Sequence, residues 1–217
     1  MKRSQALIAA LAVAGLLSGS AALSRSKGKA PTAVELTTDA GTIVIAIRSR
    51  QAPASSAAFL AQVRGKRYDG GSFFRTVRPD TERTQPPIQV VQAGVTDSGA
   101  PVAEGPIPHE DTARTGLRHI DGAVSLPRGP IGTTSATSFF ISVGAHPALD
   151  FGGKRNADGQ GFAVFGQVIC GMDVVRKIHG LPVGGASPAP QMEGQMLAPP
   201  VVIRQARITA PRCPSGR

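Results

Sequence analysis

One arginine and one glutamine stand in surroundings that suit chemistry without a covalent intermediate. Arg75 follows two phenylalanines, and Gln92 precedes an alanine and a glycine. An arginine side chain is a fixed cation with a planar fork of donors, so it can hold an oxygen acceptor without transferring a proton. Because an arginine on a strand is by itself more often a surface cation, this role depends on the rest of the pattern.

The residues that usually carry covalent, metal or phosphate chemistry form no recognisable signature. The sequence lacks the phosphate-cradling GxxxxGK[ST], dinucleotide-binding GxGxxG, hydrolase GxSxG and zinc-binding HExxH patterns. A nucleophilic role for Cys170 would need a base that the sequence does not place. The four histidines are dispersed along the chain: His109, His119, His146 and His179. Histidines without a partner at ligand spacing are more often structural or surface residues than metal ligands. We therefore expect neither a metal nor a cofactor.

The N-terminus has the organisation of a secretory signal peptide over residues 1–24. Lys2 and Arg3 precede an uncharged run from residue 6 to residue 17, and small residues follow where a peptidase would cut. The alternative is a membrane anchor, but the apolar run is shorter than the roughly 18 to 20 residues that a spanning helix needs. No later segment is long and apolar enough to span a bilayer. We expect a periplasmic or secreted protein, with a linker over residues 25–32.

The basic charge of the chain does not by itself indicate a nucleic-acid partner. The formal net charge is +10. Nucleic-acid binding would predict basic residues clustered on one element among aromatic side chains, whereas here they are scattered through loops and strand ends. We expect a solvated basic surface and no nucleic-acid partner.

Composition and patterning predict one β-rich domain over residues 33–210, followed by a flexible tail over residues 211–217. Glycine and proline are plentiful and tryptophan is absent, which favours many short elements joined by turns. Alternation predicts a hairpin over residues 34–47, and helical spacing predicts helices after Pro53 and over residues 171–178. Further strands are predicted at 72–77, 88–92, 123–126, 139–143, 162–168 and 201–208, with an irregular connection over 180–200. Such a set of strands with two helices fits a closed barrel.

The chain has two cysteines, which could form a disulfide in an exported protein. Cys170 follows a predicted strand and Cys213 lies in the proline-containing tail. Their spacing does not establish the geometry that a disulfide requires, so both the paired and the free states stay open.

Five short segments occur in a fixed order along the chain: Phe73-Phe74-Arg75, Val91-Gln92-Ala93-Gly94, Gly122-Ala123-Val124-Ser125-Leu126, Ser138-Phe139-Phe140-Ile141 and Phe162-Ala163-Val164-Phe165-Gly166. Together they resemble the cyclophilins, and the resemblance extends from about residue 34 to residue 208. The resemblance implies a mainly β fold, an eight-stranded antiparallel closed barrel with two flanking α-helices, and peptidyl-prolyl cis-trans isomerase activity on proline-containing segments of unfolded or exported proteins. We also expect a monomer.

The family pattern assigns roles residue by residue. Arg75 matches the catalytic arginine, and Gln92 matches the glutamine that positions the substrate backbone. Phe140 matches the aromatic floor of the proline pocket, Leu149 its aliphatic wall, and Phe162 a position that is histidine or aromatic in relatives. A cation beside an apolar slot would favour the twisted amide over both planar forms. Because no proton is transferred, activity should be nearly flat across neutral pH.

Other substrate-binding positions of the family carry different residues here. Gln89 replaces a phenylalanine, Ser138 a glutamine and Ala148 a tryptophan, while Pro127 and Arg128 replace the small residue and asparagine that hold the substrate backbone. These replacements keep an alternative open, a chaperone or scaffold of the same fold that binds proline segments with little or no catalysis. A second alternative is a basic protein that binds anionic surfaces.

Overall fold

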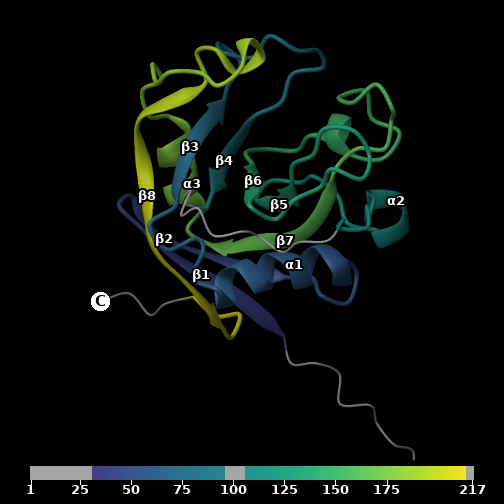
Figure 1. The fold of residues 1–217 in the computed structure, drawn as a ribbon, viewed down its shortest axis with the longest axis vertical. Coiled ribbons are helices and arrows are strands. Elements are labelled where there is room, and N and C mark those ends of the chain that lie inside the picture. Colours follow the sequence, from purple (N-terminus) through teal and green to yellow (C-terminus); the bar gives the residue numbers. More distant parts are fainter. Residues whose placement is uncertain (1–30, 96–105, 214–217) are drawn as a thin grey trace, which may run out of the picture. The chain divides into compact units, whose positions relative to one another are not determined.

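The computed structural model describes residues 31–95 and 106–213, and within them eight antiparallel strands close into a barrel (Figure 1). Around the barrel the strands run in the order β1-β2-β7-β5-β6-β4-β3-β8. The predicted closed barrel is confirmed. The strands are β1 (Thr32–Thr38), β2 (Gly41–Ile47), β3 (Ser72–Val77), β4 (Val90–Gly94), β5 (Ala123–Leu126), β6 (Ser138–Ser142), β7 (Ala163–Cys170) and β8 (Met196–Thr209).

Among residues 31–95 and 106–213, three α-helices accompany the barrel, one more than the sequence predicts. The two expected helices are α1 (Pro53–Arg64), which packs against β7 and β8, and α3 (Met172–His179), which packs against β2, β3 and β4. The additional helix, α2 (Thr112–Thr115), is a single turn. The Asp111 side chain caps it by accepting from the Arg114 backbone N–H at 2.9 Å. A turn stabilised by local bonds carries too little apolar periodicity to be recognised in a sequence.

The main core lies inside the barrel and beneath α1. Five buried aromatic side chains meet there, with ring centroids 4.8 to 5.9 Å apart in tilted or edge-on pairs, arrangements that aromatic quadrupoles favour. These rings belong to Phe59, Tyr68, Phe73, Phe139 and Phe165.

A second, smaller apolar cluster is separate from this core. Phe139 and Phe140 are neighbours on β6, and because side chains alternate across a strand, the first enters the main core and the second the smaller cluster. The other members are Val77, Ile88, Val90 and Leu149, with Phe162 packed against them.

The observed boundaries differ from the predicted ones at both ends of the domain. β1 begins at Thr32, one residue before the predicted domain. β8 begins at Met196, so the connection predicted as irregular through residue 200 ends earlier. Two 3-10 turns, η1 (Pro147–Leu149) and η2 (Pro190–Met192), interrupt the long connections. The predicted signal peptide and most of the predicted linker lie outside the described residues.

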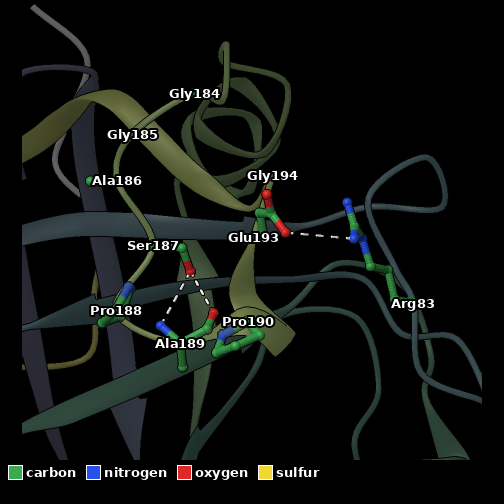
Figure 2. Close-up of a pocket in the computed structure, with 10 residues that line it drawn as sticks. All are labelled: Arg83, Gly184, Gly185, Ala186, Ser187, Pro188, Ala189, Pro190, Glu193 and Gly194. Carbon is green, nitrogen blue, oxygen red and sulfur yellow. Dashed lines mark hydrogen bonds and ion pairs between the residues drawn. The ribbon is translucent and has the colours of Figure 1, made fainter.

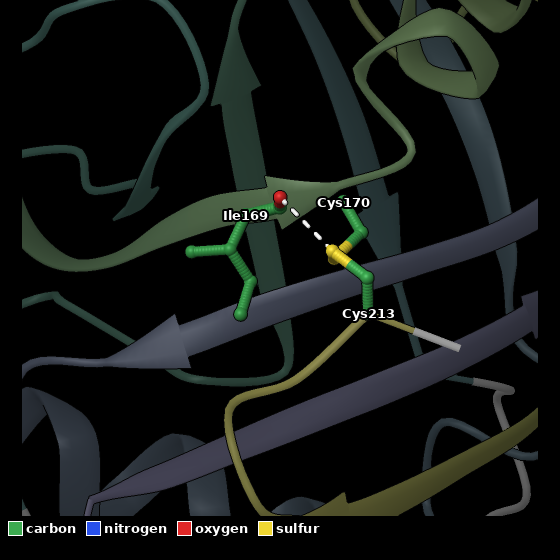
Figure 3. The surroundings of a disulfide bond; sticks show 3 residues. All are labelled: Ile169, Cys170 and Cys213. Carbon is green, nitrogen blue, oxygen red and sulfur yellow. Dashed lines mark hydrogen bonds between the residues drawn. A yellow bond between two sulfur atoms is a disulfide. The ribbon is translucent and has the colours of Figure 1, made fainter. Parts of the chain in front are cut away.

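The two cysteines form a disulfide (Figure 3). Cys170 is the last residue of β7, and Cys213 lies in the segment after β8, with a Cα–Cα distance of 5.7 Å. The bond attaches the start of the predicted tail to the barrel; residues 214–217 lie outside the described part. Across residues 31–95 and 106–213, no helix has the length and apolar character needed to cross a membrane.

Candidate functional site

A pocket of about 180 Å³ opens beside the smaller apolar cluster. Seven of the ten predicted site residues line it: Arg75, Gln92, Pro127, Arg128, Phe140, Leu149 and Phe162. The structure therefore brings together residues that are spread over five strands or loops and over the 88 sequence positions from 75 to 162. The remaining lining residues are Ile88, Val90, Arg155 and Met192.

A bulge in β3 turns Arg75 towards this pocket. Residues two apart on a regular strand share a face, so Arg75 would follow Phe73 into the barrel core. The pairing of β3 with both β4 and β8 shifts register between these two residues. Because an extra residue in a strand reverses the facing of those that follow, Phe73 is buried in the main core while Arg75 lines the pocket.

Two glutamines hold the guanidinium of Arg75. Its Nη1 donates to Gln92 Oε1 at 3.0 Å, while its Nε and Nη2 both donate to Gln195 Oε1, at 2.9 and 2.6 Å. Gln195 is buried and its own amide donates to the Thr81 carbonyl at 2.9 Å. Three hydrogen bonds from a planar group leave little rotational freedom, so the cation is fixed in one orientation.

Burial shapes the electrostatics of this arginine. Desolvation is the main cause that lowers the pKa of Arg75, and the nearby Arg155 lowers it further, whereas Glu82 raises it. Arginine begins from so high a value that it stays charged in proteins. The pocket therefore holds a partly desolvated cation, whose interactions are stronger than they would be in water.

Aromatic and aliphatic side chains form another part of the pocket lining. The rings of Phe140 and Phe162 meet edge to face at a centroid distance of 5.5 Å. The Phe162 backbone N–H donates to the Leu149 carbonyl at 3.0 Å, which joins the second ring to the aliphatic wall. A slot with these walls suits a small apolar ring.

Arg128 lies over one end of this slot. Its guanidinium carbon is 5.6 Å from the centre of the Phe162 ring, within the range of a cation–π contact. Two nitrogens bind both carboxylate oxygens of Asp158 at 2.8 Å, and Nε donates to the Gly161 carbonyl at the same distance. The Arg128 side-chain hydrogen bond is the largest cause that lowers the pKa of the exposed Asp158, to about 2.

Arg155 is a pocket residue that the sequence analysis missed. Its Nη1 donates to the carbonyls of Thr84 and Pro86 at 3.1 Å, and its Nη2 lies 3.0 Å from a Glu82 oxygen. Arg155 thus joins the loop before β7 to the loop between β3 and β4. Neither Arg155 nor Gln195 belongs to a recognisable segment, and only the closing of the barrel brings them to Arg75.

The domain matches a known family over most of its length. A family model described as cyclophilin type peptidyl-prolyl cis-trans isomerase/CLD matches residues 33–207. The chain belongs to this family. The expected membership and the expected enzyme class are therefore confirmed.

Curated relatives agree with the family match. The chain is 32% identical over 177 residues to peptidyl-prolyl cis-trans isomerase A of Dickeya dadantii, a match that covers 82% of this chain and 84% of the relative. It is also 32% identical to peptidyl-prolyl cis-trans isomerase cyp18 of Streptomyces antibioticus, covering 81% and 97% of the two chains.

A solved cyclophilin shares the fold at lower sequence identity. The crystal structure of a Cryptosporidium parvum cyclophilin type isomerase, obtained in the presence of the dipeptide Ala-Pro, superposes with a TM-score of 0.62 at 17% identity. The match covers 82% of this chain and 99% of that chain.

Three of the residues predicted from the cyclophilin pattern do not line the pocket. Ile88 and Val90 alternate with Gln89, so the pocket receives the two apolar side chains and not the glutamine. Ser138 begins β6 and pairs with Gly94. Ala148 lies in η1, and its carbonyl accepts from the Arg155 backbone N–H at 3.1 Å.

A second, more open hollow of about 680 Å³ lies on the loop that leads into β8 (Figure 2). Glycine and proline residues form half of its lining, and Ser187 closes a turn by donating to the Ala189 carbonyl at 2.6 Å. Across it, Arg83 and Glu193 approach to 3.8 Å as an exposed ion pair. Exposed pairs of this kind add little stability.

Proposed function

We propose that this cyclophilin accelerates rotation about Xaa-Pro peptide bonds in exported polypeptides and so assists their folding. The observation that carries the proposal is the position of Arg75, whose guanidinium is held by Gln92 and Gln195 at the rim of the slot formed with Phe140 and Phe162. A proline ring fits such a slot, and a prolyl amide then lies beside the cation.

The physical task is to stabilise an amide that has lost its conjugation. Resonance gives the C–N bond partial double-bond character and a rotation barrier of about 18 to 20 kcal/mol. In the twisted amide the nitrogen lone pair is released and becomes an acceptor. Arg75 can hold the proline carbonyl oxygen and donate towards this nitrogen, which stabilises the twisted form more than either planar form. No covalent bond forms and no proton is transferred.

The residues around Arg75 supply preorganisation. Gln92 and Gln195 orient the guanidinium before the substrate binds, so little reorganisation remains during rotation. Phe140, Leu149 and Phe162 hold the ring while the preceding residue turns. In this proposal Gln92 also positions the substrate backbone on the N-terminal side.

The replaced positions support a second candidate, a binder of proline segments with little turnover. Pro127 and Arg128 stand where relatives hold the substrate backbone, and the Arg128 guanidinium is already bound to Asp158 and Gly161. A protein with this pocket could retain proline binding and lose the alignment that rotation needs.

Export is supported by two features at opposite ends of the chain. Residues 1–24 have the pattern of a signal peptide. The Cys170–Cys213 bond is of the kind that persists in oxidising compartments. We therefore place the protein in the periplasm or outside the cell, acting as a monomer on proline-containing segments of its clients. The solved neighbour obtained with Ala-Pro is consistent with such substrates.

The deciding experiment is exchange spectroscopy on an Ala-Pro-containing peptide with a catalytic amount of the mature protein. An isomerase produces exchange cross-peaks between the cis and trans forms within seconds, whereas the uncatalysed process takes tens to hundreds of seconds. Shifted peptide signals without accelerated exchange would refute catalysis and favour the binder. An inactive result with no shifts would refute both candidates.

A further inference from the structure

Behind the pocket lies a chain of three hydrogen-bonded polar side chains that the proposed chemistry does not use. His119 Nδ1 is 2.8 Å from Asp150 Oδ1, and His119 Nε2 is 2.9 Å from Ser125 Oγ. All three residues are buried, and the His119 side chain is fully inaccessible. Burying polar groups is costly unless they are paired, and here both ring nitrogens have partners.

The partners determine the state of the imidazole. Burial acts to raise the pKa of Asp150, but the hydrogen bonds from the side chain and backbone of His119, together with the electrostatic influence of His119 and Arg118, outweigh burial and lower it, so the carboxyl is ionised at neutral pH. A carboxylate can only accept, so Nδ1 carries the hydrogen. In the neutral ring Nε2 then accepts from the Ser125 hydroxyl.

His119 also holds the turn that carries the aliphatic wall. Its carbonyl accepts from the His146 backbone N–H at 2.7 Å, before η1. Its own backbone N–H donates to Asp150 Oδ1 at 3.1 Å, directly after Leu149. Together with the ring nitrogen, three hydrogen bonds from one residue clamp the two ends of η1.

The same ring supports the floor of the pocket. His119 stacks on Phe140 with an interplanar angle of 10° and a centroid distance of 6.0 Å. Ser125, which binds the far nitrogen of the imidazole, pairs with Phe140 across the β5–β6 ladder. One imidazole is therefore connected to the wall through Asp150 and to the floor through Ser125.

We propose that His119 is a positioning residue of the proline pocket: by joining Asp150 to Ser125 it holds Leu149 opposite Phe140 at the separation that a proline ring requires. The inference rests on the proposed function, because it assumes that the pocket takes proline. His119 touches no reacting atom, so its contribution is to affinity and alignment.

The test compares variants that remove or keep the hydrogen bonding between His119 and Asp150. His119→Leu and Asp150→Ala remove the connection between wall and floor, and we expect each to weaken binding of an Ala-Pro peptide about tenfold. Asp150→Asn keeps a side-chain oxygen that can accept from the backbone N–H and from Nδ1 of His119. Affinity should therefore stay within about threefold of wild type. Tyr68→Phe is the matched control, because it also removes a buried hydrogen bond, 2.6 Å to the Ala136 carbonyl, but in the main core.

The readout is peptide affinity by NMR titration, with the free energy of unfolding measured for each variant. Unchanged affinity in a folded His119→Leu protein would overturn the inference, as would an equal loss in Tyr68→Phe. Because turnover is not the readout, a wild-type chain that binds proline without isomerising it refutes the proposed activity and leaves the positioning role intact.

Two measurements cover the cases in which a variant fails to fold or the wild type does not bind. Nitrogen shifts of the wild-type imidazole should report hydrogen on Nδ1 through the neutral range, and hydrogen on Nε2 there would contradict the clamp. Nuclear Overhauser contacts between the Leu149 methyls and the Phe140 ring should weaken in Asp150→Ala and persist in Tyr68→Phe. Contacts unchanged in Asp150→Ala would equally contradict it.

Discussion

Gln195 accepts two hydrogen bonds from Arg75, at 2.9 and 2.6 Å, although 120 positions separate the two residues. The contact joins β3 to the segment immediately before β8, so the closed barrel itself completes the environment of the cation. A fixed guanidinium is the central requirement of the proposed mechanism.

Loss of the cation should abolish most of the activity and leave the fold intact. Arg75→Ala removes the group that stabilises the twisted amide, and we expect kcat/KM for a proline peptide to fall by about 100-fold or more. Arg75→Lys, which keeps the charge without the planar fork, should recover only part of the rate. Circular dichroism provides the folding control, and a rate near wild type in Arg75→Ala would remove this residue from the mechanism.

Loss of the Gln195 oxygen should loosen the cation without removing it. In Gln195→Met two charge-assisted hydrogen bonds are lost, and we expect kcat to fall about tenfold with a smaller change in KM. Gln167→Met is the matched control, because it removes a glutamine hydrogen bond of 2.8 Å to the Asp121 carbonyl, away from the pocket. Equal losses of kcat in both variants would indicate a general effect on the barrel.

Removal of the Arg128 side chain should open one end of the slot and release Asp158. In Arg128→Ala we expect KM to rise severalfold, because the cover over Phe162 is lost. The pKa of Asp158 should rise from about 2 towards about 3.9, the ordinary value of an aspartate, in a carbon-detected NMR titration. Arg176→Ala, which breaks the exposed pair with Asp121, is the control and should leave both quantities unchanged.

The disulfide should stabilise the fold without affecting the site. The bond closes a loop with a sequence separation of 43, and Cys213→Ser should lower the free energy of unfolding by about 2 to 4 kcal/mol. Cys170 lies about 23 Å along β7 from Ala163, at the other end of the strand from the pocket. Activity at low temperature should therefore be retained, and a large loss there would show that the tail influences the pocket.

Stability should decline in mild acid because of His119. Burial is the main cause that lowers the pKa of His119, and the repulsion from His146 adds to it, while the hydrogen bond and charge of Asp150 oppose the shift. Because the folded pKa lies below the unfolded one, the unfolded chain binds the proton first as pH falls. The free energy of unfolding should fall once pH drops below about 6.5, until the folded histidine also protonates.

Denaturant titrations between neutral and mildly acidic pH measure this decline. His179, whose pKa burial also lowers, contributes in the same direction. His119→Leu is therefore the control: the fall in its free energy of unfolding between neutral and mildly acidic pH should be smaller than in the wild type but should not vanish. Arg118, which lies 3.8 Å from Asp150, is present in both proteins and so does not contribute to the difference between them. A decline of the same size in His119→Leu would contradict this assignment.

The class of fold and the apolar residues of the site could be predicted without the structure. Alternation and turn residues predicted the strands, because period-two patterning is local, and the resemblance to the cyclophilins identified Phe140, Leu149 and Phe162 as pocket residues. The order of short segments likewise identified Arg75 and Gln92, since these residues lie within recognisable stretches.

The groups that hold the Arg75 guanidinium and the buried polar side chains behind the pocket are set by contacts between distant segments. Gln195 and Arg155 reach Arg75 from distant loops, the β3 bulge sets its facing, and the Ser125–His119–Asp150 chain forms where three separate segments meet. The pairing of Cys170 with Cys213 was equally undecided. Such contacts depend on register, bulges and barrel closure, which are collective outcomes of packing, so no local pattern in the sequence encodes them.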